Sequence, residues 1–314
     1  MHVIVTGATG LIGRRLCAVL QGSGHRVTAL SRDAERARRV LPQGVSCLTW
    51  GGHGSGSADD WEAAVAAADA VVHLAGEPVA GRRWSKDFKE TFKASRVQTT
   101  RDLVRVIRQD ASRPRAFVCA SAVGYYGDRG DETLDERSPP GDDFLAGVCV
   151  EWEAAATSAA GPATRVAMMR IGIVLASEGG PLPEMLYPLP VRVSPWKLGL
   201  GGRLGSGRQW VPWVHVEDAV GLLAQAVEDD RLSGPVNVTA PEPVRNATLA
   251  RAIGRALHRP PILPVPGWVL SLAMGEVAYV LLTGQRVLPA AANAAGYEFR
   301  YRDIDAALRS LLPL

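Results

Sequence analysis

Lysine is scarce in this 314-residue chain. Only Lys86, Lys89, Lys93 and Lys197 are present among 35 basic residues, which are balanced by 32 acidic ones. The formal net charge is +3, and the basic residues form no stripe interleaved with aromatic side chains. A nucleic-acid-binding protein needs such a basic surface, so we expect no nucleic-acid partner.

Cysteine is also rare and is widely spaced. Cys17, Cys47, Cys119 and Cys149 form no C-x-x-C pair, and no histidine stands near them at metal-ligand spacing. This pattern argues against a disulfide framework and against a metal site. We therefore expect a cytoplasmic protein without a bound metal.

The chain has no long uninterrupted hydrophobic run. Its N-terminus enters a strand pattern at once, without the charged and apolar segments of a signal peptide. The most apolar stretch, 262–283, contains Pro264, Pro266, Gly275 and Glu276. A carboxylate inside a membrane span is costly, so we predict a buried or subunit-facing helix there and no membrane insertion.

Strand patterns and helix patterns alternate along most of the chain. Strands are predicted at 2–5, 25–30, 45–50, 70–74, 116–120, 164–171 and 236–239, and helices at 11–20, 31–40, 61–68, 88–109, 144–159 and 246–257. This alternation is typical of parallel strands joined by crossover helices. We predict an α/β fold, a Rossmann-type doubly wound parallel sheet with a smaller C-terminal α/β lobe.

The Gly- and Pro-rich texture after residue 175 divides the chain. We predict a Rossmann domain over 1–175, with its sheet completed by about 211–240. The segments 176–210 and 241–314 are predicted to form the C-terminal substrate or lid lobe. Residues 199–207, Gly-Leu-Gly-Gly-Arg-Leu-Gly-Ser-Gly, are predicted to be irregular.

A glycine motif lies between the first predicted strand and helix. In Gly7-Ala-Thr-Gly10-Leu-Ile-Gly13, glycine permits a tight turn, and the helix N-terminus offers free N–H groups to a pyrophosphate. A turn that merely packs tightly is the alternative. The predicted cofactor contacts here are Gly7, Thr9, Gly10, Leu11, Ile12 and Gly13.

Ser31 and Arg32 follow the second predicted strand, where NAD-specific domains place an acidic residue against the ribose 2′-hydroxyl. A hydroxyl followed by a guanidinium suits a 2′-phosphate instead. The sequence therefore favours NADP(H), although Asp33 is an alternative ribose ligand. After the fourth strand we predict further cofactor contacts, namely Leu74, Ala75, Gly76, Glu77 and Arg82.

Several signatures extend this pattern along nearly the whole chain. They are Ala75-Gly-Glu77, Arg83-Trp84, Ser95-Arg96, Ser121-Ala-Val-Gly-Tyr-Tyr126, Trp152-Glu153, Gly201-Gly-Arg-Leu-Gly205, Trp213-Val-His-Val-Glu-Asp218, Asn237-Val-Thr-Ala-Pro-Glu-Pro-Val244 and Gln285-Arg-Val-Leu-Pro289. With them the chain resembles the extended short-chain dehydrogenase/reductases, and within these the atypical epimerase-like or cell-division-inhibitor-like branch. The resemblance implies a C-terminal lobe that closes over the nicotinamide end of the cofactor.

The Tyr-x-x-x-Lys pair of active superfamily members is missing. No tyrosine in the chain has a lysine four residues later. The family pattern places Leu145 near the tyrosine position, Cys149 near the lysine position and Arg96 at the usual helix asparagine. The usual proton-transfer machinery is therefore absent.

The candidate catalytic residues are Ser121, Tyr125, Tyr126 and Arg96. Ser121 ends a predicted buried strand, where ligands of doubly wound folds bind. A tyrosine of the following loop could donate a proton, and Arg96 could polarise a carbonyl. For each, a structural role is the alternative.

His215 and Cys149 invite catalytic interpretations that the sequence does not require. His215 lies in a motif that marks a strand-to-helix junction in the superfamily, with Asp218 expected to cap the helix. Cys149 is an isolated thiol, which is more often a small buried hydrophobe. The sequence does not establish either role.

The leading hypothesis is an NADP(H)-dependent oxidoreductase that acts on an unidentified small molecule. The alternatives are a non-catalytic NADP-binding regulator and a sugar-nucleotide epimerase or dehydratase. We expect a small-molecule substrate as the partner and a monomer or homodimer as the assembly.

Overall fold

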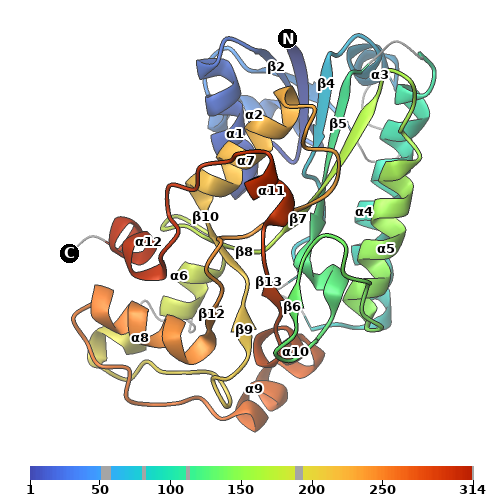
Figure 1. Ribbon diagram of the computed structural model, residues 1–314. Helices are drawn as coiled ribbons and strands as arrows, with labels where there is room; N and C mark the ends of the chain where they lie inside the picture. The colour runs from blue at the N-terminus through green and yellow to red at the C-terminus, as the bar shows by residue number, and fades with distance from the viewer. Residues whose placement is uncertain (51–57, 80–82, 111–113, 188–193, 313–314) are drawn as a thin grey trace.

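A seven-stranded parallel sheet forms the centre of the N-terminal part of the molecule (Figure 1). The computed structural model describes residues 1–50, 58–79, 83–110, 114–187 and 194–312. The sheet comprises β1 (His2–Thr6), β2 (Arg26–Ser31), β3 (Ser46–Thr49), β4 (Ala70–His73), β5 (Ala116–Ala122), β7 (Arg165–Ile171) and β11 (Gly234–Val238). Their order is β11-β7-β5-β4-β1-β2-β3, which confirms the predicted doubly wound fold.

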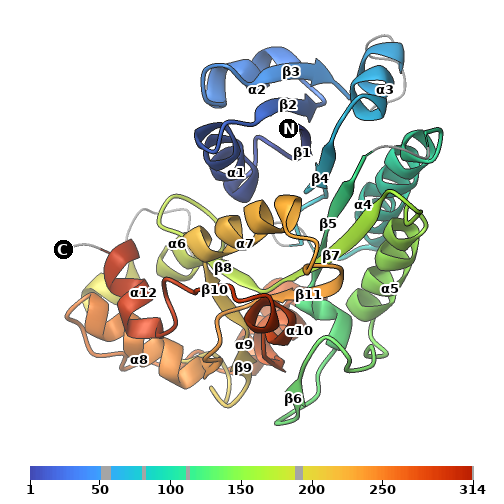
Figure 2. The same cartoon turned by 45° about the horizontal axis from the view of Figure 1, so that its top comes forward.

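Helices cover both faces of this sheet, as Figure 2 shows. One layer contains α1 (Leu11–Gly22), α2 (Ala34–Val40) and α7 (Val216–Glu228), and the other contains α3 (Ala58–Ala66), α4 (Lys86–Ile107) and α5 (Phe144–Thr157). Because successive strand residues point to opposite faces, Val3 and Val5 pack in the first layer and Ile4 in the second. Strands covered on both sides explain the continuous apolar runs of the sequence.

Polar caps set the first residue of several helices. The predicted helix 31–40 begins only at Ala34, because Ser31 still belongs to β2 and the carboxylate of Asp33 accepts a hydrogen bond from Arg36 N at 2.8 Å. The predicted helix 88–109 begins two residues early, at Lys86, since Ser85 Oγ accepts from Phe88 N.

A smaller lobe follows β7, with its own apolar core. It contains β8 (Ile173–Leu175), α6 (Pro181–Leu186), η2 (Pro195–Leu198), β9 (Trp210–Val211), β10 (Trp213–His215), β12 (Val244–Arg245), α8 (Asn246–Ala256) and α12 (Ile304–Leu311). Of the segment 211–240, which we predicted to complete the main sheet, β11 joins it, whereas β10 pairs with β8 in a separate two-stranded sheet.

The returning chain crosses back to the Rossmann part. The 3-10 turn η1 (Val123–Tyr126) follows β5, and β6 (Thr133–Leu134) then pairs with β13 (Arg286–Val287) of the C-terminal segment. Behind β13, α11 (Ala290–Ala294) packs beside β11. The two parts of the chain are therefore held together beside the carboxyl end of β5.

The segment 262–283, predicted to be a buried or subunit-facing helix, is not one continuous helix. The segment forms α9 (Gly267–Met274), a 3-10 turn η3 (Gly275–Val277) and α10 (Ala278–Leu282). Gly275 breaks the helix with a φ of +62°, and α9 buries none of its side chains. Trp268 and Leu272 are 71% and 73% exposed. Nowhere in the described ranges is a helix both long and apolar enough to cross a membrane.

Two helical glycines offer a test of how tightly the first turn packs. A Cβ on Gly13 would lie 2.7 Å from Ala8 Cα and closer still to the Gly7 carbonyl oxygen, whereas a Cβ on Gly147 meets nothing within 4 Å. We expect Gly13→Ala to lower the free energy of unfolding by about 2–3 kcal/mol, because backbone must move. Gly147→Ala should raise it by about 0.5–1 kcal/mol. Urea denaturation measures both, and a Gly13→Ala protein of wild-type stability would contradict the close contact.

Candidate functional site

The glycine turn follows β1 and lies beside the end of β4. The strand order of the sheet reverses between these two strands. Gly7 has a φ of +65°, and a Cβ on it would lie 2.6 Å from the carbonyl of Leu74. Gly10 is the N-cap of α1 and has no side chain that could accept a hydrogen bond from the first turn. This turn also contains no acidic residue. The amides of the first turn are thus free to receive an anion, as a pyrophosphate site requires.

A buried histidine supports this turn from below. Thr6 Oγ1 lies 2.7 Å from His73 Nδ1 and accepts hydrogen bonds from Leu74 N at 3.2 Å and Ala75 N at 3.3 Å. Thr99 Oγ1 lies 3.3 Å from His73 Nε2. Burial, with a further contribution from the nearby Arg96 cation, lowers the pKa of His73 to about 3. The ring is therefore neutral and holds the ends of β1 and β4 together.

The end of β2 exposes the residues predicted to select the cofactor. Ser31 Oγ donates to the Asp33 carbonyl at 3.1 Å, and the Arg32 side chain is exposed. The Asp33 carboxylate caps α2, as described above. The Arg32 side chain is thus exposed just beyond β2, while Asp33, the alternative ribose ligand, already accepts a hydrogen bond.

Arg96 closes the loop between β4 and α4. Its Nη2 donates to the Glu77 carbonyl at 2.8 Å and its Nη1 to the Phe92 carbonyl at 3.2 Å. The guanidinium lies over the Phe92 ring at 3.7 Å, and a Cβ on Gly76 would approach it to 3.2 Å. Burial lowers the pKa of Arg96 to about 10, so the group keeps its charge at neutral pH. Arg82, predicted in the same loop, lies outside the described residues.

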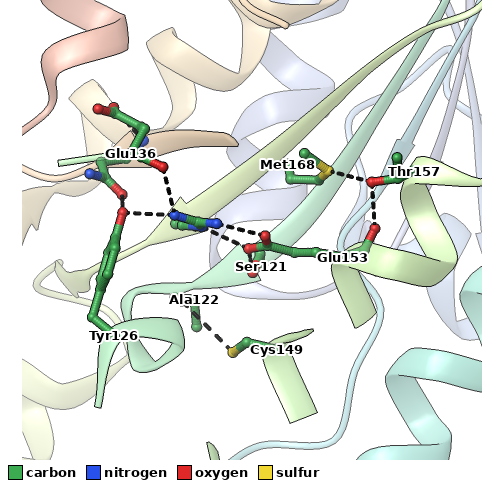
Figure 3. A network of polar contacts seen from close by, with 10 residues as sticks. Ser121, Ala122, Tyr126, Glu136, Cys149, Glu153, Thr157 and Met168 are labelled. Atoms are coloured by element: carbon green, nitrogen blue, oxygen red, sulfur yellow. Dashed lines mark hydrogen bonds and ion pairs between the residues drawn. The ribbon is translucent and has the colours of Figure 1, made fainter. Parts of the chain in front are cut away.

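Ser121 belongs to a buried polar network, drawn in Figure 3. Its hydroxyl donates to Glu153 Oε1 at 2.6 Å, and Glu153 forms a bidentate ion pair with Arg170, with both N–O distances 2.8 Å. Arg170 Nη1 also donates to the Tyr126 hydroxyl at 2.9 Å. That hydroxyl in turn donates to Asn237 Oδ1 at 2.7 Å.

The two candidate tyrosines have different surroundings. Tyr126 is fully buried and its hydroxyl both accepts and donates within the network, and burial raises its pKa to about 12. Tyr125 is half-buried, and its ring packs against the Arg170 guanidinium at 3.5 Å. Of the two, Tyr125 is the one with exposed surface.

Leu145 and Cys149, which the resemblance places near the family's tyrosine and lysine positions, lie on α5. Leu145 faces η1, where a Cβ on Gly124 would lie 3.5 Å from Leu145 Cβ. Cys149 Sγ lies 3.8 Å from the Ala122 carbonyl, and burial raises the pKa of its thiol to about 12. A thiol with this pKa is protonated and a poor nucleophile at neutral pH.

His215, not Asp218, caps α7. His215 Nδ1 accepts from Glu217 N at 3.1 Å, and its ring stacks on Tyr301 with centroids 3.8 Å apart. Asp218 sits one turn further in, where it accepts from Arg300 N at 2.7 Å and Tyr301 N at 2.9 Å. The predicted aspartate cap is wrong, because the carboxylate instead anchors the C-terminal segment.

Glu153, Arg170 and His73 support the candidate site but were not among the predicted site residues. Arg170 and His73 are polar residues within otherwise apolar strands, and Glu153 entered only through the Trp152-Glu153 signature. Among the described residues, no group of three or more His, Cys, Asp or Glu side chains could hold a metal ion.

The comparisons define the class of protein. The chain belongs to the NAD dependent epimerase/dehydratase family, whose model matches residues 3–239. Residues 265–311 match a second model, the Domain of unknown function DUF1731. The resemblance to the epimerase-like branch is thereby confirmed.

Within this family the chain is similar over its length to several named proteins. It is 40% identical to the chloroplastic epimerase family protein SDR39U1 homolog of Arabidopsis thaliana, covering 99% of this chain and 87% of that protein. It is 36% identical to the epimerase family protein YfhF of Bacillus subtilis, covering 99% and 98%. Because one relative is chloroplastic, the cytoplasmic location stays a prediction.

Among solved structures, that of the human epimerase family protein SDR39U1 (isoform 2), crystallised with NADPH, matches with a TM-score of 0.84. The two are 35% identical, and the match covers 99% of each chain. The nucleoside-diphosphate sugar epimerase of Corynebacterium glutamicum matches with a TM-score of 0.75 at 34% identity, covering 99% of this chain and 58% of that one.

The neutrality of His73 predicts a pH dependence of stability. The unfolded chain protonates this group below its ordinary pKa of 6.5, whereas the folded chain does so only near 3. The unfolded state therefore binds more protons in this window, and stability falls as the pH falls.

We measure the free energy of unfolding by urea denaturation from pH 6 to pH 4. We expect its slope against pH to be shallower in His73→Gln than in wild type by about 1.4 kcal/mol per pH unit. The exposed Gln109 serves as control, because Gln109→Asn removes no titratable group and should keep the wild-type slope. Parallel wild-type and His73→Gln profiles would show that His73 is charged in the fold.

Proposed function

We propose that this chain is an NADP(H)-dependent oxidoreductase that reduces a carbonyl, imine or alkene of a small molecule. One observation supports the choice of NADP(H): the N-terminus of α1 has no side-chain cap, and Arg32, one strand away, is exposed. The human relative crystallised with NADPH supports the same choice. Helix N-termini and arginine are suited to pyrophosphate and 2′-phosphate, respectively.

The cofactor contacts follow from this placement. The turn from Gly7 to Gly13, including Thr9, Leu11 and Ile12, would hold the pyrophosphate, and Ser31 with Arg32 would hold the 2′-phosphate. The loop Leu74–Glu77 would line the nicotinamide side, with Arg82 as a further predicted contact. When bound, NADPH supplies the hydride.

Arg96 is proposed as the fixed cation of the active site. Its guanidinium forms no ion pair with a carboxylate of the described residues, and is held by two carbonyls and the Phe92 ring. Its charge is therefore not neutralised locally. Such a cation stabilises negative charge that develops on a substrate oxygen, the effect that usually contributes most to catalysis.

We propose different roles for Ser121, Tyr125 and Tyr126, because their hydroxyls have different hydrogen-bond partners. The Ser121 hydrogen is given to Glu153, so only its lone pairs are left, which suits an amide N–H of the cofactor better than a carbonyl. Tyr126 has a structural role, because both of its hydrogen bonds are internal. Tyr125 is left as the proposed proton donor.

A non-catalytic NADP-binding regulator is the second candidate. It is favoured by the same network, since the hydroxyls of Ser121 and Tyr126 are engaged within the protein. A regulator would bind NADPH and never oxidise it, so the assay of hydride transfer separates the two functions.

Arg32→Ala tests the cofactor. We expect the affinity for NADPH to fall about 10- to 100-fold, as loss of a charge-assisted phosphate contact predicts, with the affinity for NADH unchanged. Calorimetry on purified protein measures both. Arg39→Ala removes an exposed charge from the other end of α2 and should change neither. Equal losses for both cofactors, or no loss, would refute the 2′-phosphate assignment.

Arg96→Met tests the catalytic proposal. On any compound of a carbonyl and enone panel that wild type reduces, we expect kcat to fall about 100- to 1000-fold, as loss of one oxyanion-stabilising group does elsewhere. Arg96→Lys should recover part of it, and the Kd for NADPH should change little. If wild type oxidises NADPH with no compound, the oxidoreductase proposal fails and the regulator is favoured.

A further inference from the structure

A surface basin lies between the start of α4, the start of α5 and η3. It consists of two adjoining hollows of about 370 and 270 Å³, which share Trp84, Phe144 and Glu276 as lining residues. We call it the Trp84 basin. It is separate from the predicted contacts of the cofactor, and none of the residues proposed above for catalysis lines it.

Lysine gathers in this basin and almost nowhere else. Lys86, Lys89 and Lys93 line the larger hollow, and the chain has only one other lysine. Their spacing of three and four residues places them on one face of α4. Glu90 and Glu276 are the acidic residues that line this hollow, and Lys93 also pairs with Glu151. Three carboxylates therefore balance the three ammonium groups, so an added anion must exchange with one of them.

The floor of the basin is aromatic. The rings of Trp84 and Phe144 meet edge to face with centroids 5.6 Å apart. Lys89 Nζ lies 5.2 Å from the Phe144 centroid and 5.9 Å from the Trp84 centroid, within the range of cation–π attraction. A planar ligand on this floor would therefore meet an ammonium group held in place by the rings.

Lys89 already has an anionic partner that a ligand could replace. Its ammonium pairs with Glu276 of η3, whose side chain is 61% exposed. An ion pair with so exposed a partner contributes little net stability, so an incoming anion that also covers the aromatic floor can compete with it. An anion that binds at Lys89 would have to exchange with Glu276.

The smaller hollow extends to Leu145. This residue lies near the position that the resemblance gives to the family's tyrosine. Leu145 faces Gly124 of η1, next to Tyr125. A ligand that extends inward from Lys89 would therefore place its far end beside the proposed proton donor.

We propose that the Trp84 basin binds the substrate as a planar, unsaturated or aromatic organic acid, whose carboxylate or phosphate displaces Glu276 from Lys89. Only the part of the ligand that would react, near Leu145, rests on the proposed function. Binding of its carboxylate or phosphate depends on the basin itself, and is testable without NADPH or turnover.

The experiment is calorimetric titration of the purified protein, with and without NADPH, with cinnamate, phenyl phosphate and the neutral cinnamyl alcohol. We expect one of the anions to bind and cinnamyl alcohol to bind at least about fivefold more weakly. A stronger response to cinnamate assigns a carboxylate, and one to phenyl phosphate assigns a phosphate. Equal binding of the alcohol, or binding of neither anion, would overturn the proposal whatever the hydride assay shows.

Two variants of the same ion pair separate binding from a structural role. Lys89→Gln should weaken anion binding about fivefold, and Glu276→Gln should strengthen it by a similar factor, because the competing carboxylate is gone. Both variants lose the same pair, so a merely structural effect would shift affinity in the same direction. Arg105→Gln removes a charge from the other end of α4 and should leave affinity unchanged. Affinity unaltered by Lys89→Gln, or lowered by Glu276→Gln, would refute the exchange.

Discussion

The ion pair between Arg170 and Glu153 is the interaction on which the arrangement at the carboxyl end of the sheet depends. The two side chains are 3% and 10% exposed, and taking such charges out of water costs several kcal/mol per ion unless their geometry and remaining hydrogen bonds compensate. Here the pair is bidentate, Arg170 also donates to the Tyr126 hydroxyl and the Glu136 carbonyl, and Glu153 also accepts from Ser121. Burial opposes the charge of Arg170, but the hydrogen bonds and the charge of Glu153 outweigh it and raise the pKa of Arg170, so the guanidinium remains charged.

This pair joins segments that are distant in sequence. Arg170 lies on β7, Glu153 on α5 and Ser121 on β5, and the Tyr126 hydroxyl carries the contact to Asn237 on β11. Asn237 then donates to the Leu288 carbonyl, and the Glu136 carboxylate accepts from the backbone N–H groups of Asn237 and Ala291. The C-terminal segment is thus tied to the sheet by partly buried hydrogen bonds.

The sequence was informative where function depends on local backbone, and silent where it depends on tertiary proximity. The glycine turn and the parallel sheet follow from residues that are neighbours in the chain, since a positive φ at Gly7 and alternating strand and helix patterns are local properties. The polar network around Arg170 does not follow from neighbouring residues, because 17 residues separate Glu153 from Arg170 and no periodicity links them. The cap of α7 was misassigned for the same reason. Asp218 looks like a helix-terminal carboxylate, and only the distant Arg300 and Tyr301 amides draw it away.

The chain has no Tyr-x-x-x-Lys pair, but two arginines, Arg96 and Arg170, flank α5. Their side chains have different partners. Arg170 is neutralised by Glu153, which fits a role in holding the structure. Arg96 is held by the carbonyls of Glu77 and Phe92 and by an aromatic ring, and these partners orient a guanidinium without cancelling its net charge. The buried Cys149 lies near the position that the resemblance gives to the family's lysine, and the Arg96 charge favours the thiolate of Cys149 against the effect of burial. In the proposed function, α4 would then supply the positive charge in place of α5. Because the pKa of Arg96, about 10, is still well above neutrality, this charge would be permanent, whereas the proton must come from a separate group.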